Sequence, residues 1–328
     1  MKFVTVTPAG RRQYLDILAA YLLRNRDKID EHHWWLNTRV PEDVAYVHRL
    51  ADRYPDFFRV VIKPKDPGLS LGGSIWSYLR DCTDPDTIYA RFDDDICYMA
   101  DDAVSNLRRF REENPEPFLV LGNIVNNAVC THFYQRAGVV PTSWGAVANE
   151  CMDEIGWRSP SFARRLHRRF LKDLEFGKQA KWKNVPMEID GTRRFSINAI
   201  SWYGRDFLGI PELDTDDIEE ESFLTAVLPA RMGRPNAVCT SALFGHYAFY
   251  TQRKYLEATS RDILARYRRL SSQVAAVDDQ KRPLLLRTYE KLHWTAAETA
   301  WQAKNGVRNL RKGISNRIKN SSSSRRAA

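Results

Sequence analysis

The first 95 residues alternate between short runs of β-branched and aromatic residues and segments whose apolar residues have helical spacing. Strands are expected at residues 2–7, 31–37, 58–62 and 87–92, and helices at residues 11–24, from 41 onward and at 75–81. A strand, a helix and a second strand form a βαβ unit, whose strands run parallel in one sheet. The alternation therefore predicts an α/β fold with a mostly parallel sheet and helices on both faces.

The same mixed pattern continues after residue 95. Further strands are expected at residues 118–121 and 195–203, and further helices at residues 161–170, 223–228 and from 260 to about 318. Residues 321–328 are a low-complexity stretch of Ser, Arg and Ala, and we expect this tail to be disordered.

The net charge of +9 is concentrated at the C-terminal end of the chain. Residues 281–328 contain 12 Lys and Arg against two Glu, so the rest of the chain is nearly neutral. Apolar residues such as Trp301, Leu310 and Ile314 recur there at helical spacing. Three interpretations stay open for this basic helical extension: contact with an anionic membrane, a solvated helix packed on the body, and binding to nucleic-acid phosphates.

Composition and motifs exclude several classes of protein. With 43% hydrophobic residues and nine Trp, a chain of 328 residues is not mainly disordered and can bury a large core. Its five cysteines form no CxxC pair, which argues against a zinc ribbon or a disulfide framework and favours a reducing, cytoplasmic setting. The apolar stretch at residues 14–23 is too short to span a bilayer, and we expect no signal peptide. P-loop, GxGxxG, GxSxG and HExxH motifs are absent from the sequence.

Asp93, Asp94 and Asp95 directly follow the strand expected at residues 87–92. Three adjacent carboxylates repel one another, so in a partly buried place they need a compensating cation. Open α/β sheets bind ligands at the carboxyl ends of their strands. Hard oxygen ligands suit Mg²⁺ or Mn²⁺ bridging a diphosphate. The triplet therefore predicts a metal-dependent site, and a solvated acidic turn is the alternative.

Four segments resemble, in their order along the chain, the nucleotide-sugar-dependent glycosyltransferases of the GT-A fold, in particular bacterial or phage-type members similar to family 2. The segment YARFDDDI at residues 89–96 is similar to their DxD motif, and VTVTPAGRRQYLDIL at 4–18 resembles their first strand and nucleotide-binding turn. EEESFL at 219–224 resembles the ED-x-x-L element of inverting members, and GHYAFYTQ at 245–252 resembles a late segment that supplies a histidine to the metal.

The resemblance implies a GT-A, Rossmann-like domain over residues 1–256. Its nucleotide-binding half would be residues 1–95 and its acceptor half residues 96–256. A basic helical region at 257–320 and the tail at 321–328 would follow. The resemblance also implies a UDP-, GDP- or dTDP-linked sugar as donor and a divalent metal, Mn²⁺ or Mg²⁺.

Carried over residue by residue, the resemblance assigns roles at the site. Asp95 would bind the metal, with Asp93 and His246. Asp93 would also contact the ribose or nucleoside, with help from Asp94. The strand ends offer further nucleotide contacts: Thr5, Thr7, Pro8, Arg11 and Asn37.

The base that deprotonates the acceptor hydroxyl would be Glu221, where the family usually has Asp. Glu220 and Asp217 compete for this role. A solvated helix N-terminus is the alternative for the acidic stretch, because carboxylates there favour the helix dipole.

Other single residues also keep two interpretations. His246 lies in an apolar run, where a histidine satisfied within the core is the alternative to a metal ligand. Trp144 and Trp202 are either platforms for a sugar or members of the core.

Together these patterns predict a metal-dependent, inverting glycosyltransferase of the cytoplasm, with a peripheral place at the inner membrane face as the alternative location. Its acceptor would be a hydroxyl of a cell-surface polysaccharide or a lipid-linked glycan. A transferase acting on modified bases in DNA, a nucleotidyltransferase and a non-enzymatic module that binds membranes or nucleic acid are the alternatives.

Overall fold

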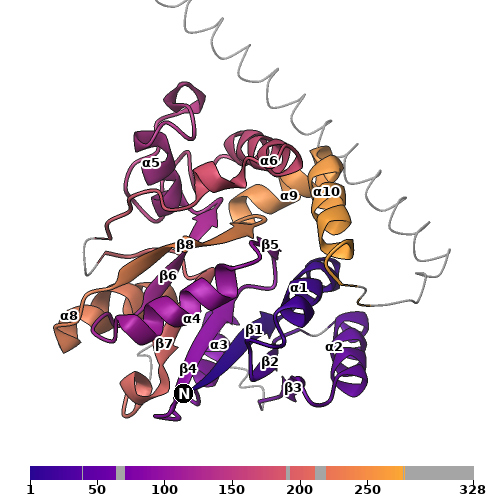
Figure 1. Cartoon of the computed structure of the whole chain (residues 1–328), viewed down its shortest axis with the longest axis vertical. Coiled ribbons are helices and arrows are strands. Elements are labelled where there is room, and N and C mark those ends of the chain that lie inside the picture. The colour runs from indigo at the N-terminus through magenta and orange to yellow at the C-terminus, as the bar shows by residue number, and fades with distance from the viewer. Residues whose placement is uncertain (39, 64–70, 190–192, 211–218, 276, 278–328) are drawn as a thin grey trace, which may run out of the picture. The chain divides into compact units, whose positions relative to one another are not determined.

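The computed structural model describes residues 1–38, 40–63, 71–189, 193–210, 219–275 and 277 (Figure 1). One compact unit comprises Met1–Arg253 and Asp262–Val277, and residues 254–261 are the described part of a second unit. The basic residues beyond 277 and the tail at 321–328 lie outside the described residues. In the part of the chain that is described, no helix has both the length and the apolar character needed to cross a bilayer.

Within the described residues, eight strands form one mixed sheet in the order β3-β2-β1-β4-β7-β6-β8-β5. The pairs β3/β2, β2/β1, β1/β4 and β6/β8 are parallel, whereas β4/β7, β7/β6 and β8/β5 are antiparallel. The predicted α/β class with a mostly parallel sheet is confirmed. The strands are β1 (Lys2–Ala9), β2 (Glu31–Leu36), β3 (Phe58–Val61), β4 (Thr87–Phe92), β5 (Ile96–Met99), β6 (Val120–Val125), β7 (Ala199–Tyr203) and β8 (Ala237–His246).

Helices flank the sheet, with α4 in front of the strands and α3 behind them in Figure 1. Helix α1 packs on β5, α2 packs on β2 and β3, and α4 crosses β6, β7 and β8. The helices are α1 (Arg12–Arg24), α2 (Pro41–Arg53), α3 (Leu71–Leu79), α4 (Ala103–Glu113), α5 (Ala128–Arg136), α6 (Pro160–Glu175), α7 (Glu220–Ser222), α8 (Leu228–Met232), α9 (Tyr250–Thr259) and α10 (Arg261–Ser272). Shorter turns are η1 (Thr142–Trp144), η2 (Gln179–Trp182), η3 (Gly204–Phe207) and a π-helical turn, η4 (Phe223–Val227).

The predicted helix from residue 260 is correct at its start, but α10 ends at Ser272. The hydroxyls of Ser271 and Ser272 donate back to the carbonyl oxygens of Arg268 and Arg269, at 3.0 and 2.9 Å. Such local bonds compete with continuation of the helix. The predicted helix beyond residue 277 lies outside the described residues.

The sheet topology brings the carboxyl ends of six strands to one edge. Strands β1, β2, β3 and β4 are parallel to one another. Strand β7 is antiparallel to both β4 and β6, and β6 is parallel to β8, so β6 and β8 point the same way as β4. The carboxyl ends of β1, β2, β3, β4, β6 and β8 therefore share an edge, and residues that follow neighbouring strands are brought together.

Candidate metal and nucleotide site

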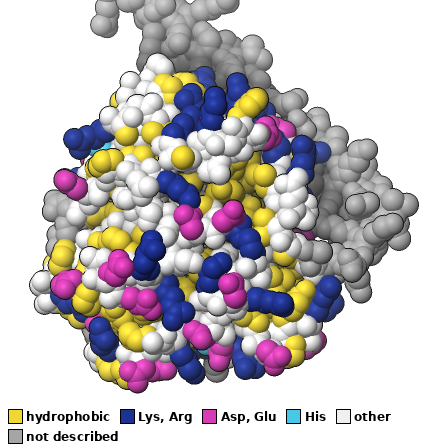
Figure 2. Space-filling model, viewed as in Figure 1, with side chains coloured by type: hydrophobic (Ala, Val, Ile, Leu, Met, Phe, Trp, Pro, Cys, Tyr) yellow, Lys and Arg dark blue, Asp and Glu magenta, His cyan; other side chains and the backbone are white. Residues whose placement is uncertain are grey.

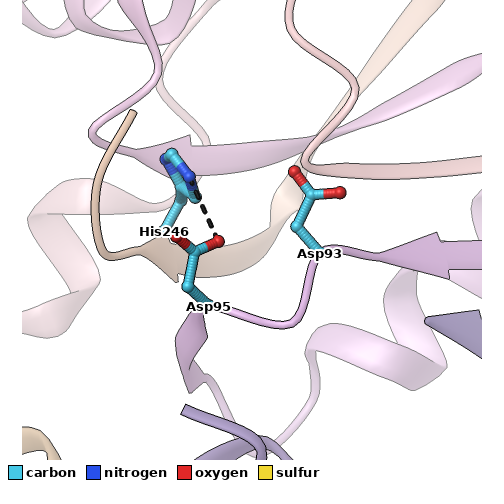
Figure 3. Close-up of side chains that lie close together, drawn as sticks. All are labelled: Asp93, Asp95 and His246. Carbon is cyan, nitrogen blue, oxygen red and sulfur yellow. Dashed lines mark ion pairs between the residues drawn. The ribbon is translucent and has the colours of Figure 1, made fainter. Parts of the chain in front are cut away.

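Two carboxylates and an imidazole converge at this edge of the sheet. Asp93 and Asp95 lie in the turn after β4, and His246 is the last residue of β8. One ligand atom from each of the three lies within 4.8 Å of the other two. Figure 3 shows the side chains gathered in this way, with the imidazole directed at the Asp95 carboxylate. The predicted grouping of Asp95, Asp93 and His246 is thus present in the fold.

Asp95 is almost completely buried, with 1% of its surface exposed, and cationic groups surround it. Its carboxylate lies 3.3 Å from His246 Nε2, 3.1 Å from Arg253 Nη2 and 3.5 Å from Arg11 Nη2. Burial acts to raise the pKa of Asp95, but these neighbouring charges outweigh it and hold the pKa well below its ordinary value. Arginines therefore supply part of the compensating charge that the sequence analysis expected from a cation.

The orientation of His246 is set by the end of the neighbouring strand. His246 Nδ1 lies 3.1 Å from the carbonyl oxygen of Asn126, the residue that follows β6. A proton on Nδ1 satisfies that carbonyl and leaves Nε2 to face Asp95. Burial acts to lower the pKa of His246, but Asp95 outweighs it and raises the pKa above its ordinary value. The imidazole is therefore placed as a ligand or as an ion-pair partner of Asp95.

Asn126 is itself held in an uncommon conformation. Its φ is 65°, in the left-handed region that non-glycine residues seldom adopt. Its Nδ2 donates to the carbonyl oxygen of Tyr247 and to Gln252 Oε1, both at 3.0 Å. These bonds hold the turn after β6 against the segment that follows His246.

Asp94 pairs with Arg11, the residue just before α1. Both of its carboxylate oxygens accept from Arg11, one from Nε at 2.9 Å and one from Nη2. Such a bidentate ion pair fixes the orientation of the guanidinium as well as compensating the charge. A Cβ added at Gly10 would lie 3.3 Å from the Asp94 carboxylate, so the chain passes close to this pair. The turn after β1 and the turn after β4 are therefore joined through Arg11 and Asp94.

Asp93 connects the metal-ligand group to the acidic segment at 219–221. Its carboxylate accepts from Asn198 Nδ2 at 3.0 Å and from Arg91 Nη2 at 3.1 Å. The same guanidinium donates through Nη1 to Glu220 Oε1 at 3.1 Å. Arg91 therefore bridges Asp93 and Glu220 within the buried part of the site.

The two adjacent glutamates face different partners. Glu220 is buried against Arg91, and burial raises the pKa of Glu220 to about 7 despite that charge. Glu221 lies 2.9 Å from Arg194 Nη2 and accepts from Cys151 Sγ at 3.2 Å. Burial also raises the pKa of Glu221, against the charge of Arg194. The Glu221 side chain is 20% exposed and that of Glu220 is 9% exposed, so Glu221 is the more accessible of the two. The third candidate base, Asp217, lies outside the described residues.

The predicted nucleotide contacts on β1 and β2 differ in accessibility. Thr5 and Thr7 are fully buried within β1, and Thr5 Oγ1 lies 2.8 Å from His32 Nδ1. Pro8 and Asn37 are half-buried, and the backbone N–H of Asn37 donates to the carbonyl oxygen of Ala9 at 3.3 Å. Pro8 and Asn37, like Arg11, are therefore placed at the carboxyl edge of the sheet, whereas the two threonine side chains lie within the strand packing.

The two tryptophans have different environments. Trp202 has no exposed surface and stacks on Tyr89 with ring centroids 5.8 Å apart. Trp202 is therefore a member of the core, which was the alternative to a sugar platform. Trp144 is half-buried in η1, and its role as a sugar platform stays a prediction.

Four polar residues at the site were missed by sequence reasoning: Arg91, Asn126, Asn198 and Arg253. Arg91 carries the one local signal, because it is a charged residue inside an otherwise apolar strand. Asn126 follows β6, Asn198 precedes β7 and Arg253 lies in α9, so long-range pairing and packing decide their positions.

Comparison with known proteins finds similarity at the level of structure. No protein-family model and no curated protein matches the sequence. A mannosyltransferase from Pyrobaculum calidifontis, solved with GDP-Man and Mn²⁺, has 15% identity and a TM-score of 0.45, covering 92% of this chain and 73% of that one. A 4-diphosphocytidyl-2C-methyl-D-erythritol synthase from Anaerococcus prevotii has 12% identity and a TM-score of 0.38, with coverages of 82% and 96%. A mycobacterial protein has 14% identity and a TM-score of 0.41, with coverages of 85% and 76%. Values this low do not carry an activity from one protein to another.

Proposed function

We propose that this chain is a metal-dependent glycosyltransferase that moves a sugar from a nucleoside diphosphate to an acceptor hydroxyl with inversion. The observation that carries the proposal is the convergence of Asp93, Asp95 and His246 at the carboxyl edge of the sheet. Ligands of open α/β sheets bind at this edge. The GT-A assignment of residues 1–256 is part of the same proposal.

The residues present fit a divalent cation. Two carboxylates and one imidazole are a donor set that Mn²⁺ accepts, and Mg²⁺ would use mainly the carboxylates. The carbonyl of Asn126 orients the imidazole in the way that outer-shell groups orient metal ligands. A cation held by Asp93, Asp95 and His246 would supply Lewis-acid stabilisation of the departing diphosphate.

The donor would lie along the ends of β1 and β2. Pro8, Arg11 and Asn37 line this edge, and Asp94 holds the Arg11 guanidinium beside it. The base and ribose would lie over these residues, with Asp93 within reach of the ribose. A role for Thr5 and Thr7 would be to support the end of β1 from inside the sheet.

Glu221 is the proposed general base. In an inverting transfer the acceptor oxygen bonds to the anomeric carbon while the bond from that carbon to the diphosphate oxygen breaks. The acceptor proton goes to the base, and the leaving electron pair stays on the diphosphate. Glu221 suits this role because it is more accessible than Glu220 and its pKa is raised by burial. Glu220 and Asp217 stay as competitors.

The acceptor is proposed to be a hydroxyl of a glycan or lipid-linked glycan on the cytoplasmic side of a membrane. A modified base in DNA is the competing acceptor, and salt distinguishes the two. Phosphate contacts make affinity fall steeply with salt, whereas binding of an uncharged glycan does not.

Calorimetric titration of the full chain with UDP, GDP, dTDP and their sugar conjugates, with and without Mn²⁺, tests the proposal. One nucleotide series should bind in a Mn²⁺-dependent way, and the sugar conjugate should be consumed when an acceptor is supplied. Consumption of a nucleoside triphosphate with release of pyrophosphate would instead identify a nucleotidyltransferase. If no nucleotide or sugar nucleotide of the panel bound in a metal-dependent way, the proposed metal-dependent transfer would be overturned, whichever acceptor is considered.

A further inference from the structure

Basic residues follow one another along a single face of α6. Arg165, Arg168, Arg169 and Lys172 are spaced at three, one and three residues, which places them on one side of the helix. Figure 2 shows Lys and Arg side chains gathered at the top of this face of the molecule, where α6 lies in Figure 1. The opposite side of the helix packs into the body through Phe162, Ala163, Leu166, His167, Phe170 and Leu171.

Acidic neighbours neutralise part of this charge. Arg168 Nη2 lies 3.0 Å from Asp262 on α10, and Arg169 Nε lies 3.4 Å from Asp173. Arg165 and Lys172 are exposed, and neither makes an ion pair with any described residue. The face therefore keeps a positive surplus at both ends of the stripe.

An exposed aromatic side chain ends the same face. Phe176 follows the last residue of α6 and is 65% exposed. It is eleven residues after Arg165 and four after Lys172, so it continues the stripe. Gly177 then turns the chain with a φ of 65°, in the left-handed region that favours glycine, and the exposed Lys178 follows it. A phenylalanine ring between two lysines is an apolar group in a cationic setting.

We propose that this α6 face, from Arg165 to Phe176, docks on an anionic membrane surface. A helix with a cationic face and an exposed aromatic at its end lies in the plane of the interface, with cations at the headgroups and the ring at the acyl boundary. The exposed phenylalanine favours a membrane over duplex nucleic acid, which would engage the cations alone. The proposal concerns residues apart from the donor site, so it stands independently of the proposed function.

Flotation of the full chain with vesicles tests this surface. The vesicles contain phosphatidylcholine and phosphatidylglycerol in equal parts, and a second set contains phosphatidylcholine alone. Each Lys or Arg near an anionic surface contributes about a fivefold gain in affinity. The double variant Arg165→Glu with Lys172→Glu should therefore lose at least about 25-fold in affinity for the anionic vesicles. Phe176→Ser should lower the affinity for the anionic vesicles about tenfold, because it removes the apolar contribution of the phenylalanine ring.

The basic segment at residues 281–328 could also attract vesicles, so the control must match the change in charge. Arg26, just after α1, and Arg49, in α2, are exposed, and Arg26→Glu with Arg49→Glu alters the net charge equally. This control should bind vesicles within about threefold of the unmodified chain, since the charges it changes lie off the α6 face.

Urea unfolding of every variant checks that the fold is retained. Equal losses in the α6 double variant and its charge-matched control would overturn the proposal. So would a failure of the unmodified chain to bind anionic vesicles, or equal binding to vesicles without phosphatidylglycerol. Loss of duplex DNA binding with unchanged vesicle binding in the α6 variant would assign the surface to nucleic acid instead.

Discussion

His246 Nε2 lies 3.3 Å from Asp95 Oδ1, although His246 ends β8 and Asp95 lies in the turn after β4, a strand that does not neighbour β8 in the sheet. Strand β8 reaches Asp95 because it runs parallel to β6, which points the same way as β4. Ile96, the first residue of β5, pairs with His246 and draws the turn after β4 toward β8. The proposed metal site is therefore assembled by sheet order, and its function can be tested through either residue.

Substituting the histidine tests the metal site directly. His246→Ala removes the nitrogen ligand, so the Kd for Mn²⁺ should rise at least about tenfold, the effect seen even for outer-shell losses. Electron paramagnetic resonance of free Mn²⁺ gives this Kd without any assay of transfer. A matched control is His33→Ala, because His33 Nε2 also faces a carboxylate, Glu31 at 3.0 Å, but lies near the amino end of β2. Equal Mn²⁺ affinity in both variants would remove His246 from the site.

The first four strands could be predicted from sequence because their signals are local. β-Branched and aromatic runs bounded by turns place β1 to β4 within two residues of the expected bounds. Strands β5 and β8 were missed. The strand β5 has four residues, and the pairing of β8 with β6 shifts register between Gly122 and Asn123, which interrupts a regular alternation.

The site could be predicted in part, for the same reason. Asp93, Asp94 and Asp95 are adjacent in sequence, so their clustering in one turn could be predicted. Their place at the carboxyl edge of the sheet follows from the alternation of strands and helices. Arg91 and Arg253, two of the arginines that compensate these carboxylates, come from a strand interior and from α9, and no local pattern pairs Arg253 with Asp95. Such partners are decided by tertiary packing, which a single sequence does not display.

The buried Glu220 predicts a pH dependence of stability. Its pKa is about 7 in the folded chain, raised by burial from an ordinary value of 4.5. The unfolded chain therefore releases this proton first as pH rises, and this carboxyl lowers the free energy of unfolding between pH 4.5 and about 7. Above that range its effect is constant. The full effect is on the order of 3 kcal/mol.

Glu220→Gln should remove that contribution while keeping an acceptor for Arg91. Urea unfolding of both chains at several pH values gives the difference between them. The unmodified chain should lose more stability than the variant between pH 4.5 and 7, and the two curves should run parallel above it. Parallel curves across the whole range would show that Glu220 titrates as an ordinary carboxyl.

Glu221 can be tested as the base against its neighbour. Glu221→Gln keeps the shape of the side chain but cannot accept the acceptor proton, so kcat should fall about 10²- to 10⁴-fold. The Kd for the donor should be unchanged, since the proposed donor contacts lie at the ends of β1 and β2 and in the turn after β4. Glu219→Gln is the matched control, because Glu219 also pairs with Arg194, at 2.7 Å, but its side chain is 65% exposed. Full activity in Glu221→Gln together with loss in Glu220→Gln would transfer the role to Glu220.

Substitutions at Trp202 can distinguish a structural role of this residue from a role in sugar binding. It has no exposed surface, stacks on Tyr89 and packs against Phe207 with ring centroids 5.2 Å apart. Trp202→Ala should therefore lower the free energy of unfolding by about 3–5 kcal/mol, the range for deleting a large buried aromatic. Trp202→Phe keeps most of the apolar volume and should lower it by less than half as much, with the donor Kd unchanged. Urea unfolding measures the first effect and calorimetric titration the second. If the donor Kd rose in Trp202→Phe while the free energy of unfolding of that variant was unchanged, Trp202 would instead be assigned to sugar binding.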